Sequence, residues 1–413
     1  MQSVLKKIKP GQDEISNFNS VTKEFLTKLN SKLSGAKAIL GGSGAKDTWL
    51  SGSHDVDLFV QFDYKTFSQE SHLISEHLEK AVKKAFPKYE IERLHGSRDY
   101  FQINYKNLIF EVVPIIKISK SEDALNITDI SPLHAIWVNK NAKSLKDDIR
   151  LAKQFCKANK LYGAESHITA FSGYVLEILV SYYGGFEKLL KASLKWKDKE
   201  VIDPEKYHKN KHMALFNLNQ SKLNSPIIVI DPVDQTRNAA AAFSKEKLKL
   251  FQKVANQYLK SPAEKFFVKD EISKEKLSKE NGHLVFLEVI PLIGKRDVIG
   301  VKLLKSFEFI KKELTVFKIK KADWDWDNDN NAIFYFLLKE DKLSKDEIRN
   351  GPPLDLKEHV KKFKKSNKNT FTKNGKLYAT VKIEFPKLSD FVQNLIKQKY
   401  VKEKIKKIKL IVS

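Results

Sequence analysis

The chain lacks most of the features that mark secreted, zinc-binding and membrane proteins. It has one cysteine, Cys156, among 413 residues, which excludes a disulfide framework within the chain and a zinc knuckle. No apolar run is long enough to cross a bilayer, and the charged N-terminal segment lacks the apolar core of a signal peptide. P-loop and zinc-hydrolase motifs are also missing. We therefore expect a cytoplasmic protein with no membrane partner.

Acidic residues are scarce relative to basic ones. The 75 lysines and arginines exceed the 51 aspartates and glutamates, which gives a formal charge of +24. A surplus of this size favours a polyanionic partner such as nucleic acid, because each neutralised phosphate releases counterions. A lysine-rich proteome or a heat-adapted surface is the alternative explanation. The length and the 41% hydrophobic content predict a folded protein of about two to four domains.

Hydrophobic periodicity divides the chain into three parts. Residues 1–143 alternate helices and strands, residues 144–262 are mostly helical, and residues 263–413 mix both again. In the first part we expect helices at 10–33 and 71–86 and strands at 55–62, 90–94, 100–105 and 108–118. In the third part we expect strands at 283–291, 333–338 and 377–385, a helix at 296–313, and an acidic turn rather than a calcium loop at 323–328. The first part therefore has the pattern of a small α/β domain.

Two aspartates alternate in a strand-like run that follows a flexible glycine–serine turn. The turn contains Gly42 and Ser43, and the run at 55–62 begins with Asp55 and Asp57. Residues i and i+2 of a β-strand project from the same face, so the two carboxylates lie side by side. They stay ionised together when a cation binds both, and the turn offers N–H groups and a hydroxyl to a phosphate. The pattern indicates a metal and triphosphate site, hence nucleotidyl transfer; a solvated strand face is the alternative.

A third carboxylate, Glu111, stands inside the apolar run at 108–118. A charge in such a strand is costly unless it is paired or bound to a metal. If this strand lies beside the one with Asp55 and Asp57, three carboxylates converge and suit two hard divalent ions. The alternative is that Glu111 pairs with a buried lysine or arginine.

Several later segments resemble one protein family. The matching segments are 131–134, 150–155, 161–165, 171–177, 183–186, 231–238, 351–353 and 357–359. Over nearly its whole length the chain resembles the class I, archaeal-type CCA-adding enzymes, which are tRNA nucleotidyltransferases of the DNA polymerase β-like superfamily. The resemblance implies an α+β multidomain fold. Its parts are a polymerase β-like nucleotidyltransferase head (1–143), a helical central domain for base recognition (144–262) and a mixed α/β, tRNA-binding C-terminal region (263–413).

The resemblance also implies roles for individual residues. Asp55, Asp57 and Glu111 are expected to be catalytic and to hold two Mg²⁺ ions. The expected nucleotide-binding residues are Gly42, Ser43, Lys46, Ser131, His134, Lys153, Tyr162, Arg237 and Asn238. The chain departs from the family at three places: Glu111 replaces an aspartate, Lys46 replaces a common arginine, and 98–100 replaces a His-Pro-Tyr triplet.

Two groups of these residues have a rationale in the local pattern. Arg150, Lys153 and Lys157 form a basic stripe along one predicted helix, for which ordinary solvation is the alternative. Arg237 and Asn238 follow an Asp-Pro turn that we expect to open a helix, where they can recognise a base edge. A capping asparagine beside a solvated arginine is the alternative for this pair.

The implied activity is template-independent addition of C, C and A to the 3′ end of tRNA. CTP and ATP are the substrates and pyrophosphate is released. The basic C-terminal third is expected to hold the acceptor stem and its adjoining helix through backbone and shape. A poly(A) polymerase-like enzyme and a non-catalytic RNA-binding protein on the same scaffold are the alternatives. The sequence does not fix the oligomeric state, and a homodimer is one option.

Overall fold

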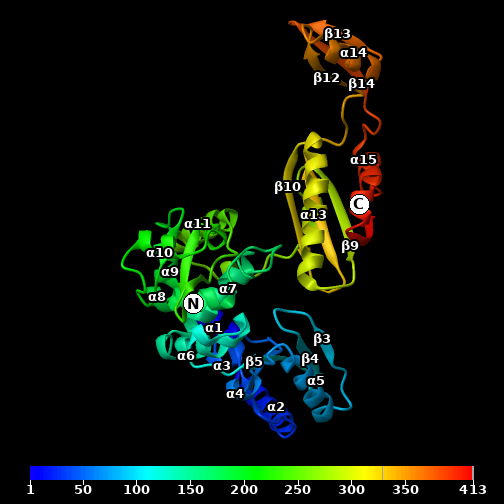
Figure 1. Ribbon diagram of the computed structural model, residues 1–413. Helices are drawn as coiled ribbons and strands as arrows, with labels where there is room; N and C mark the ends of the chain where they lie inside the picture. Colours follow the sequence, from blue (N-terminus) through cyan, green and yellow to red (C-terminus); the bar gives the residue numbers. More distant parts are fainter. Residues whose placement is uncertain (328, 412–413) are drawn as a thin grey trace. The chain divides into compact units, whose positions relative to one another are not determined.

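The computed structural model describes residues 1–327 and 329–411 of the chain (Figure 1). These residues form two compact units, Met1–Lys269 and Asp270–Ser413. None of the helices in the described ranges has both the length and the apolar character needed to span a bilayer.

A five-stranded sheet at the start of the first unit carries the predicted carboxylates. Its order is β1-β2-β5-β4-β3. The strands are β1 (Ala36–Leu40), β2 (Asp55–Phe62), β3 (Glu92–Leu94), β4 (Tyr100–Tyr105) and β5 (Leu108–Ile116). Strands β2 and β5 run parallel, and the other neighbours are antiparallel. The predictions for β2 to β5 are confirmed to within two residues at each strand end, whereas β1 was not predicted.

Alternating burial in β2 explains why the two aspartates share a face. Val56, Leu58 and Val60 are buried in the core with Phe25, whereas Asp55 is exposed and Asp57 is half-buried. Phe25 stacks on the Phe110 ring of β5 with a centroid distance of 3.9 Å. One face of the sheet therefore packs in the hydrophobic core, and the other face carries the carboxylates.

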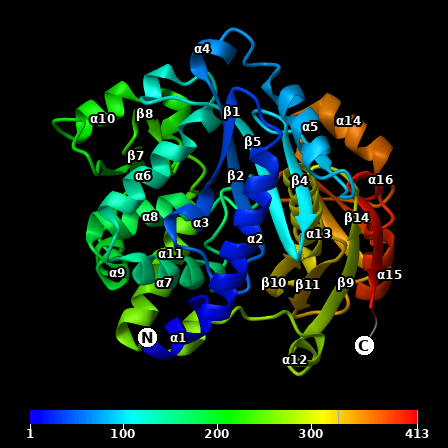
Figure 2. The ribbon, with the colours of Figure 1, turned by 90° about the horizontal axis from the view of Figure 1, so that it is seen from below.

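Helices cover the apolar face of this sheet, with α2 and α5 lying over it (Figure 2). The helices of this part are α1 (Gln2–Ile8), α2 (Gln12–Asn30), α3 (Gly42–Lys46), α4 (Tyr64–Phe67), α5 (Ile74–Ala85) and α6 (Ser131–Asn141), with short 3-10 turns η1 (Ser121–Asp123) and η2 (Ile127–Ile130). The expected flexible glycine–serine turn is instead the short helix α3. Its backbone is thereby fixed beside β2.

The rest of the first unit packs helices around a core that includes Phe155, Leu176 and Phe251. The helices are α7 (Lys146–Ala158), α8 (Gly173–Tyr183), α9 (Phe186–Ser193), α10 (Lys211–Asn217) and α11 (Lys245–Lys260), with turns η3 (Gln220–Leu223) and η4 (Glu264–Phe267). A three-stranded sheet, β6 (Glu200–Ile202), β7 (Ile227–Asp231) and β8 (Asp234–Asn238), was not expected. It escaped prediction because β7 is a short apolar run with no alternation, which periodicity cannot distinguish from buried helix.

The second unit contains a four-stranded sheet of order β10-β11-β9-β15, with α13 along one face (Figure 1). Its elements are β9 (His283–Pro291), α13 (Arg296–Glu313), η5 (Leu314–Phe317), β10 (Ile319–Trp326), β11 (Ala332–Leu338) and β15 (Ile405–Leu410). The predicted bounds of β9 and α13 match the structure. The acidic turn expected at 323–328 is wrong in part, because its first four residues belong to β10. Asp327 accepts hydrogen bonds from the N–H groups of Asp329 and Asn331 in the turn, and Asn328 lies outside the described residues.

A second sheet of this unit has the order β12-β14-β13. The remaining elements of the unit are α12 (Lys274–Ser278), β12 (Asp346–Pro353), α14 (Lys357–Ser366), β13 (Thr370–Lys373), β14 (Lys376–Lys382), α15 (Leu388–Leu395) and α16 (Lys399–Lys402). Helix α14 buries no residue and is rich in lysine, so it presents a basic surface to solvent.

Candidate active site

Gly42 makes room for the Asp57 carboxylate at the start of α3. Its φ is +53°, and a Cβ built on it would lie 1.6 Å from Asp57 Oδ2. Only glycine combines this left-handed backbone with such a close approach. Burial raises the pKa of Asp57; the Lys46 charge opposes this effect and the neighbouring Asp55 charge adds to it. A half-buried carboxylate beside a second one favours a bound cation.

The strand register places the third carboxylate next to the pair. Glu111 of β5 lies directly opposite Asp57 of β2 in the parallel ladder. Its side chain accepts a hydrogen bond from Gln102 Nε2 of β4 at 3.2 Å. In the described part of the chain, no group of three or more His, Cys, Asp or Glu side chains is arranged to hold a metal ion. The backbone therefore puts the three carboxylates on one face, but their side chains do not converge on one point here.

A buried carboxylate that the sequence analysis missed, Glu177, joins the head to the central helices. It lies on α8 with no exposed side-chain surface. Lys46 Nζ donates to its Oε2 at 2.6 Å, and Lys153 Nζ donates to its Oε1 at 2.7 Å. The Thr48 hydroxyl donates to Oε1 at 2.7 Å. Burial favours the neutral acid, but the charges of Lys153 and Lys46 prevail and lower the pKa of Glu177 to about 2.

The two lysines differ in how many of their donors are engaged. Lys153 also donates to the Thr48 carbonyl at 3.1 Å and to its hydroxyl at 2.9 Å. An ammonium group has three N–H donors, so Lys153 is saturated by Thr48 and Glu177. Among the described residues, Lys46 donates only to Glu177. Lys46 is therefore the lysine with donors left for a phosphate.

Burial rules out ordinary solvation, the alternative explanation of the basic stripe on α7, for two of its three members. Arg150 is 2% exposed and Lys153 is 3% exposed. Arg150 donates to the Trp49 carbonyl at 3.0 Å and to the Asp47 carbonyl at 2.9 Å. Helical periodicity could not show this burial, because the partners come from a loop about a hundred residues earlier in the chain.

Tyr162 lies close to the start of α8. A Cβ built on Gly173, the first residue of α8, would lie 2.8 Å from the Tyr162 hydroxyl. Lys157 Nζ lies 5.2 Å from the centroid of the Tyr162 ring. Burial raises the pKa of Tyr162, so its phenol stays a hydrogen-bond donor at neutral pH. Ser43 and Ser131 are half-buried within the first two residues of α3 and α6.

The prediction that Arg237 and Asn238 start a helix is wrong. Both lie in β8, and the next helix begins at Lys245. Asn238 is 3% exposed; its Oδ1 accepts from the N–H groups of Val229 and Ala240, and its Nδ2 donates to the Lys222 carbonyl. The amide therefore binds three backbone groups, and its role in base recognition stays a prediction.

Arg237 remains accessible and is held by Asp231. Its side chain is 30% exposed, and its Nη1 donates to Asp231 Oδ2. Asp231 has no exposed side-chain surface and lies 3.2 Å from Nε2 of His134. From β8 the Arg237 side chain therefore keeps part of its surface accessible, as the predicted base contact requires.

A sequence signal for one missed residue did exist. Glu177 is the only charged residue in the apolar helix Gly173–Tyr183, and such a residue needs a buried partner. The sequence could not name those partners, because Lys46 and Thr48 are about 130 residues away.

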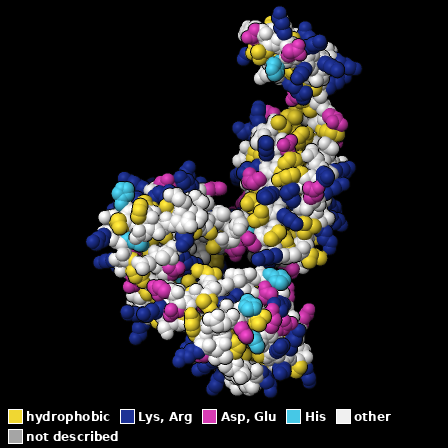
Figure 3. Space-filling model, viewed as in Figure 1, with side chains coloured by type: hydrophobic (Ala, Val, Ile, Leu, Met, Phe, Trp, Pro, Cys, Tyr) yellow, Lys and Arg dark blue, Asp and Glu magenta, His cyan; other side chains and the backbone are white. Residues whose placement is uncertain are grey.

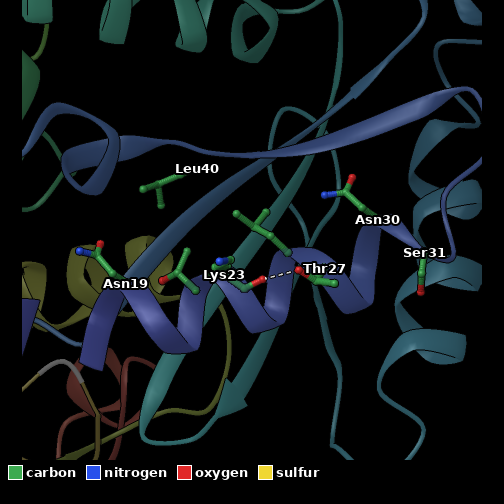
Figure 4. Close-up of a pocket in the computed structure, with 8 residues that line it drawn as sticks. Asn19, Lys23, Thr27, Asn30, Ser31 and Leu40 are labelled. Carbon is green, nitrogen blue, oxygen red and sulfur yellow. Dashed lines mark hydrogen bonds between the residues drawn. The ribbon is translucent and has the colours of Figure 1, made fainter. Parts of the chain in front are cut away.

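One hollow on the head lies away from these residues. It has a volume of about 640 Å³ and runs along α2 next to β1, lined by residues such as Lys23, Thr27 and Leu40 (Figure 4). Asn30 bonds both the N–H and the carbonyl of Ala38 there, which caps the edge strand. None of the predicted site residues lines this hollow.

Comparison with known proteins assigns the family. Residues 147–268 match the second domain of tRNA nucleotidyltransferase, and residues 296–412 match the C-terminal domain of the CCA-adding enzyme. Residues 1–150 match the Second Messenger Oligonucleotide or Dinucleotide Synthetase domain. The chain is 37% identical to the CCA-adding enzyme of Nanoarchaeum equitans, over 84% of each chain. The chain belongs to the CCA-adding enzymes.

Other members of the CCA-adding family match at lower identity. The enzyme of Methanocaldococcus jannaschii is 29% identical, over 96% of this chain and 90% of its own.

Solved structures of other enzymes share the fold of part of this chain. The Cid1 poly(U) polymerase, solved with MgATP, has a TM-score of 0.51 at 13% identity and covers 65% of this chain and 97% of its own. A cytoplasmic RNA terminal U-transferase has a TM-score of 0.50 at 13% identity, over 66% and 98%. The predicted family and the mixed α/β multidomain fold are confirmed.

Proposed function

We propose that this chain adds C, C and A to the 3′ end of tRNA, using CTP and ATP and releasing pyrophosphate. The observation that carries this proposal is the 37% identity to a CCA-adding enzyme along most of the chain. The strand register that sets Glu111 opposite Asp57 supports the chemistry, because nucleotidyl transfer needs carboxylates on one face.

We assign Asp55, Asp57 and Glu111 to a site for two Mg²⁺ ions. Their oxygen donors suit a hard cation, and the space left by Gly42 admits the Asp57 carboxylate. Magnesium, when bound, would lower the pKa of the attacking ribose hydroxyl and neutralise charge on the triphosphate. The chain itself contributes position, because these side chains stand on adjacent strands of a rigid sheet.

The nucleotide would extend from this site toward the central helices. The N–H groups of Gly42 and Ser43, the Lys46 ammonium and the Tyr162 hydroxyl are the donors we assign to its phosphates. Ser131 and His134 would hold the ribose or the phosphates. We assign Lys153 a supporting role, because Thr48 and Glu177 already use its donors.

Basic residues fit the second substrate, tRNA. Lysine and arginine side chains are spread over the faces of both units shown in Figure 3, and α14 is rich in lysine. We propose a division into a catalytic head (1–143), a base-recognition domain (144–262) and a tRNA-binding region (263–413). That the protein acts in the cytoplasm stays a prediction. That it forms a homodimer is also a prediction, and light scattering, which measures the molar mass in solution, can test it.

Nucleotide incorporation into tRNA that lacks its terminal CCA tests the function. With labelled CTP alone we expect two added residues, and with CTP and ATP together a complete CCA end. The variant Asp57→Ala is expected to bind the tRNA but to add nothing. Long tails from ATP alone would favour a poly(A) polymerase, and incorporation by Asp57→Ala at the unaltered rate would contradict the catalytic assignment.

A further inference from the structure

We propose that Asp231 is a positioning residue that fixes the orientation of Arg237 and thereby sets the choice between bases. This inference rests on the proposed function, in which Arg237 recognises the base of the incoming nucleotide.

Asp231 is the centre of a buried hydrogen-bond cluster at the end of β7. Its Oδ1 accepts from the Tyr174 hydroxyl and from the N–H of Val233, each at 3.0 Å. Its Oδ2 accepts from Arg237 Nη1 and lies 3.2 Å from His134 Nε2. With both oxygens engaged and no exposed surface, this carboxylate cannot move without breaking several contacts. It therefore holds the guanidinium in one place.

The contact leaves part of Arg237 available to a ligand. A guanidinium carries five N–H donors in a planar fork, and Asp231 engages those of one terminal nitrogen. The side chain keeps 30% of its surface exposed. A planar donor group of fixed orientation can distinguish bases by their acceptor pattern, whereas a freely rotating one cannot.

Tyr174 connects this cluster to the phosphate end of the site. Its ring stacks on the His134 ring with a centroid distance of 4.0 Å, and Lys46 Nζ lies 5.6 Å from its centroid. Lys46 is in turn bound to Glu177. The group assigned to the base and the group assigned to the phosphates thus share one support, which sets the distance between them.

Discrimination between nucleotides tests the inference. We would measure kcat and KM for CTP and for UTP at the first addition, and for ATP and CTP at the third, in the full chain. Asp231→Asn is expected to reduce the CTP-over-UTP ratio of kcat/KM by about tenfold to a hundredfold, since a fixed bidentate contact contributes discrimination of that order. Tyr174→Phe keeps the stacked ring and loses only the hydroxyl, so it is expected to fold and to show a smaller loss of the same kind.

The control is Asp234→Asn in the same turn, where, among the residues that the structure describes, the carboxylate bonds only Thr236. It is expected to leave both ratios unchanged. If Asp231→Asn and Tyr174→Phe change kcat alone and keep the ratios, the inference is wrong although the proposed function stands. If Asp231→Asn does not fold, the Tyr174→Phe ratios decide. Failure of the unaltered chain to add CCA would instead overturn the proposed function.

Discussion

The substitution Gly42→Ala is expected to reduce CTP incorporation by at least about a hundredfold while the protein stays folded. The new Cβ would lie 1.6 Å from Asp57 Oδ2, so the carboxylate must leave its position. Displacing a catalytic group by about 1 Å lowers the rate by roughly this factor. The kcat for CTP addition, measured beside the melting temperature, checks the prediction.

The matched control for this variant is Gly52→Ala. Gly52 also has a positive φ, of +76°, but nothing lies within 4 Å of the position of its Cβ. It carries the same kind of backbone strain without the collision, and its activity should stay close to that of the unaltered chain. Equal kcat values for Gly42→Ala and the unaltered protein would show that Asp57 does not need its observed position.

The substitution Glu177→Gln is expected to lower the free energy of unfolding by about 3–5 kcal/mol, the range for breaking a buried ion pair. It leaves the ammonium groups of Lys46 and Lys153 without their buried counter-charge. Adding Lys153→Met removes one of these cations and should recover part of the loss. Urea unfolding measures each value.

The control is Glu187→Gln on α9. Glu187 is exposed, and its pair with Lys191 spans 4.0 Å. We expect the free energy of unfolding of this variant to change by less than about 0.5 kcal/mol.

The unaltered protein and Glu177→Gln also test how stability depends on pH. Glu177 has a folded pKa of about 2, against an ordinary value of 4.5. A lowered folded pKa means that the stabilisation is present above about pH 4.5 and is lost as the pH falls toward 2. The stability difference between the unaltered protein and Glu177→Gln should therefore shrink across this window. A difference that stays constant there would contradict an ionised Glu177.

Local patterns predicted two helices and four strands of the head, but not β1, and the pairing of the strands came only from the structure. The alternation of residues 55–62 was enough to predict β2 and the shared face of Asp55 and Asp57. Whether Glu111 would meet them depended on the order of strands, which is set by packing across the whole sheet. From the sequence alone, the meeting of the three carboxylates could be predicted only on the condition that the two strands are neighbours.

The mistaken helix start at Arg237 has a physical cause as well. An Asp-Pro pair commonly precedes a helix, and here it makes the turn between β7 and β8 instead. The real N-cap is Ser244, whose side chain accepts from the Lys247 N–H. Strand structure is favoured here because residues 227–230 bury four apolar side chains. Local propensity does not include the free energy of this tertiary packing.

Metal binding tests the central claim that Asp55, Asp57 and Glu111 form a divalent-cation site. Mn²⁺ can replace Mg²⁺ as an oxygen-bound probe and can be counted by electron paramagnetic resonance. With a non-hydrolysable CTP analogue present, the account predicts two bound Mn²⁺ ions per chain, and a loss of that binding in Asp57→Asn. Mn²⁺ binding of equal number and affinity in Asp57→Asn and the unaltered protein would contradict it.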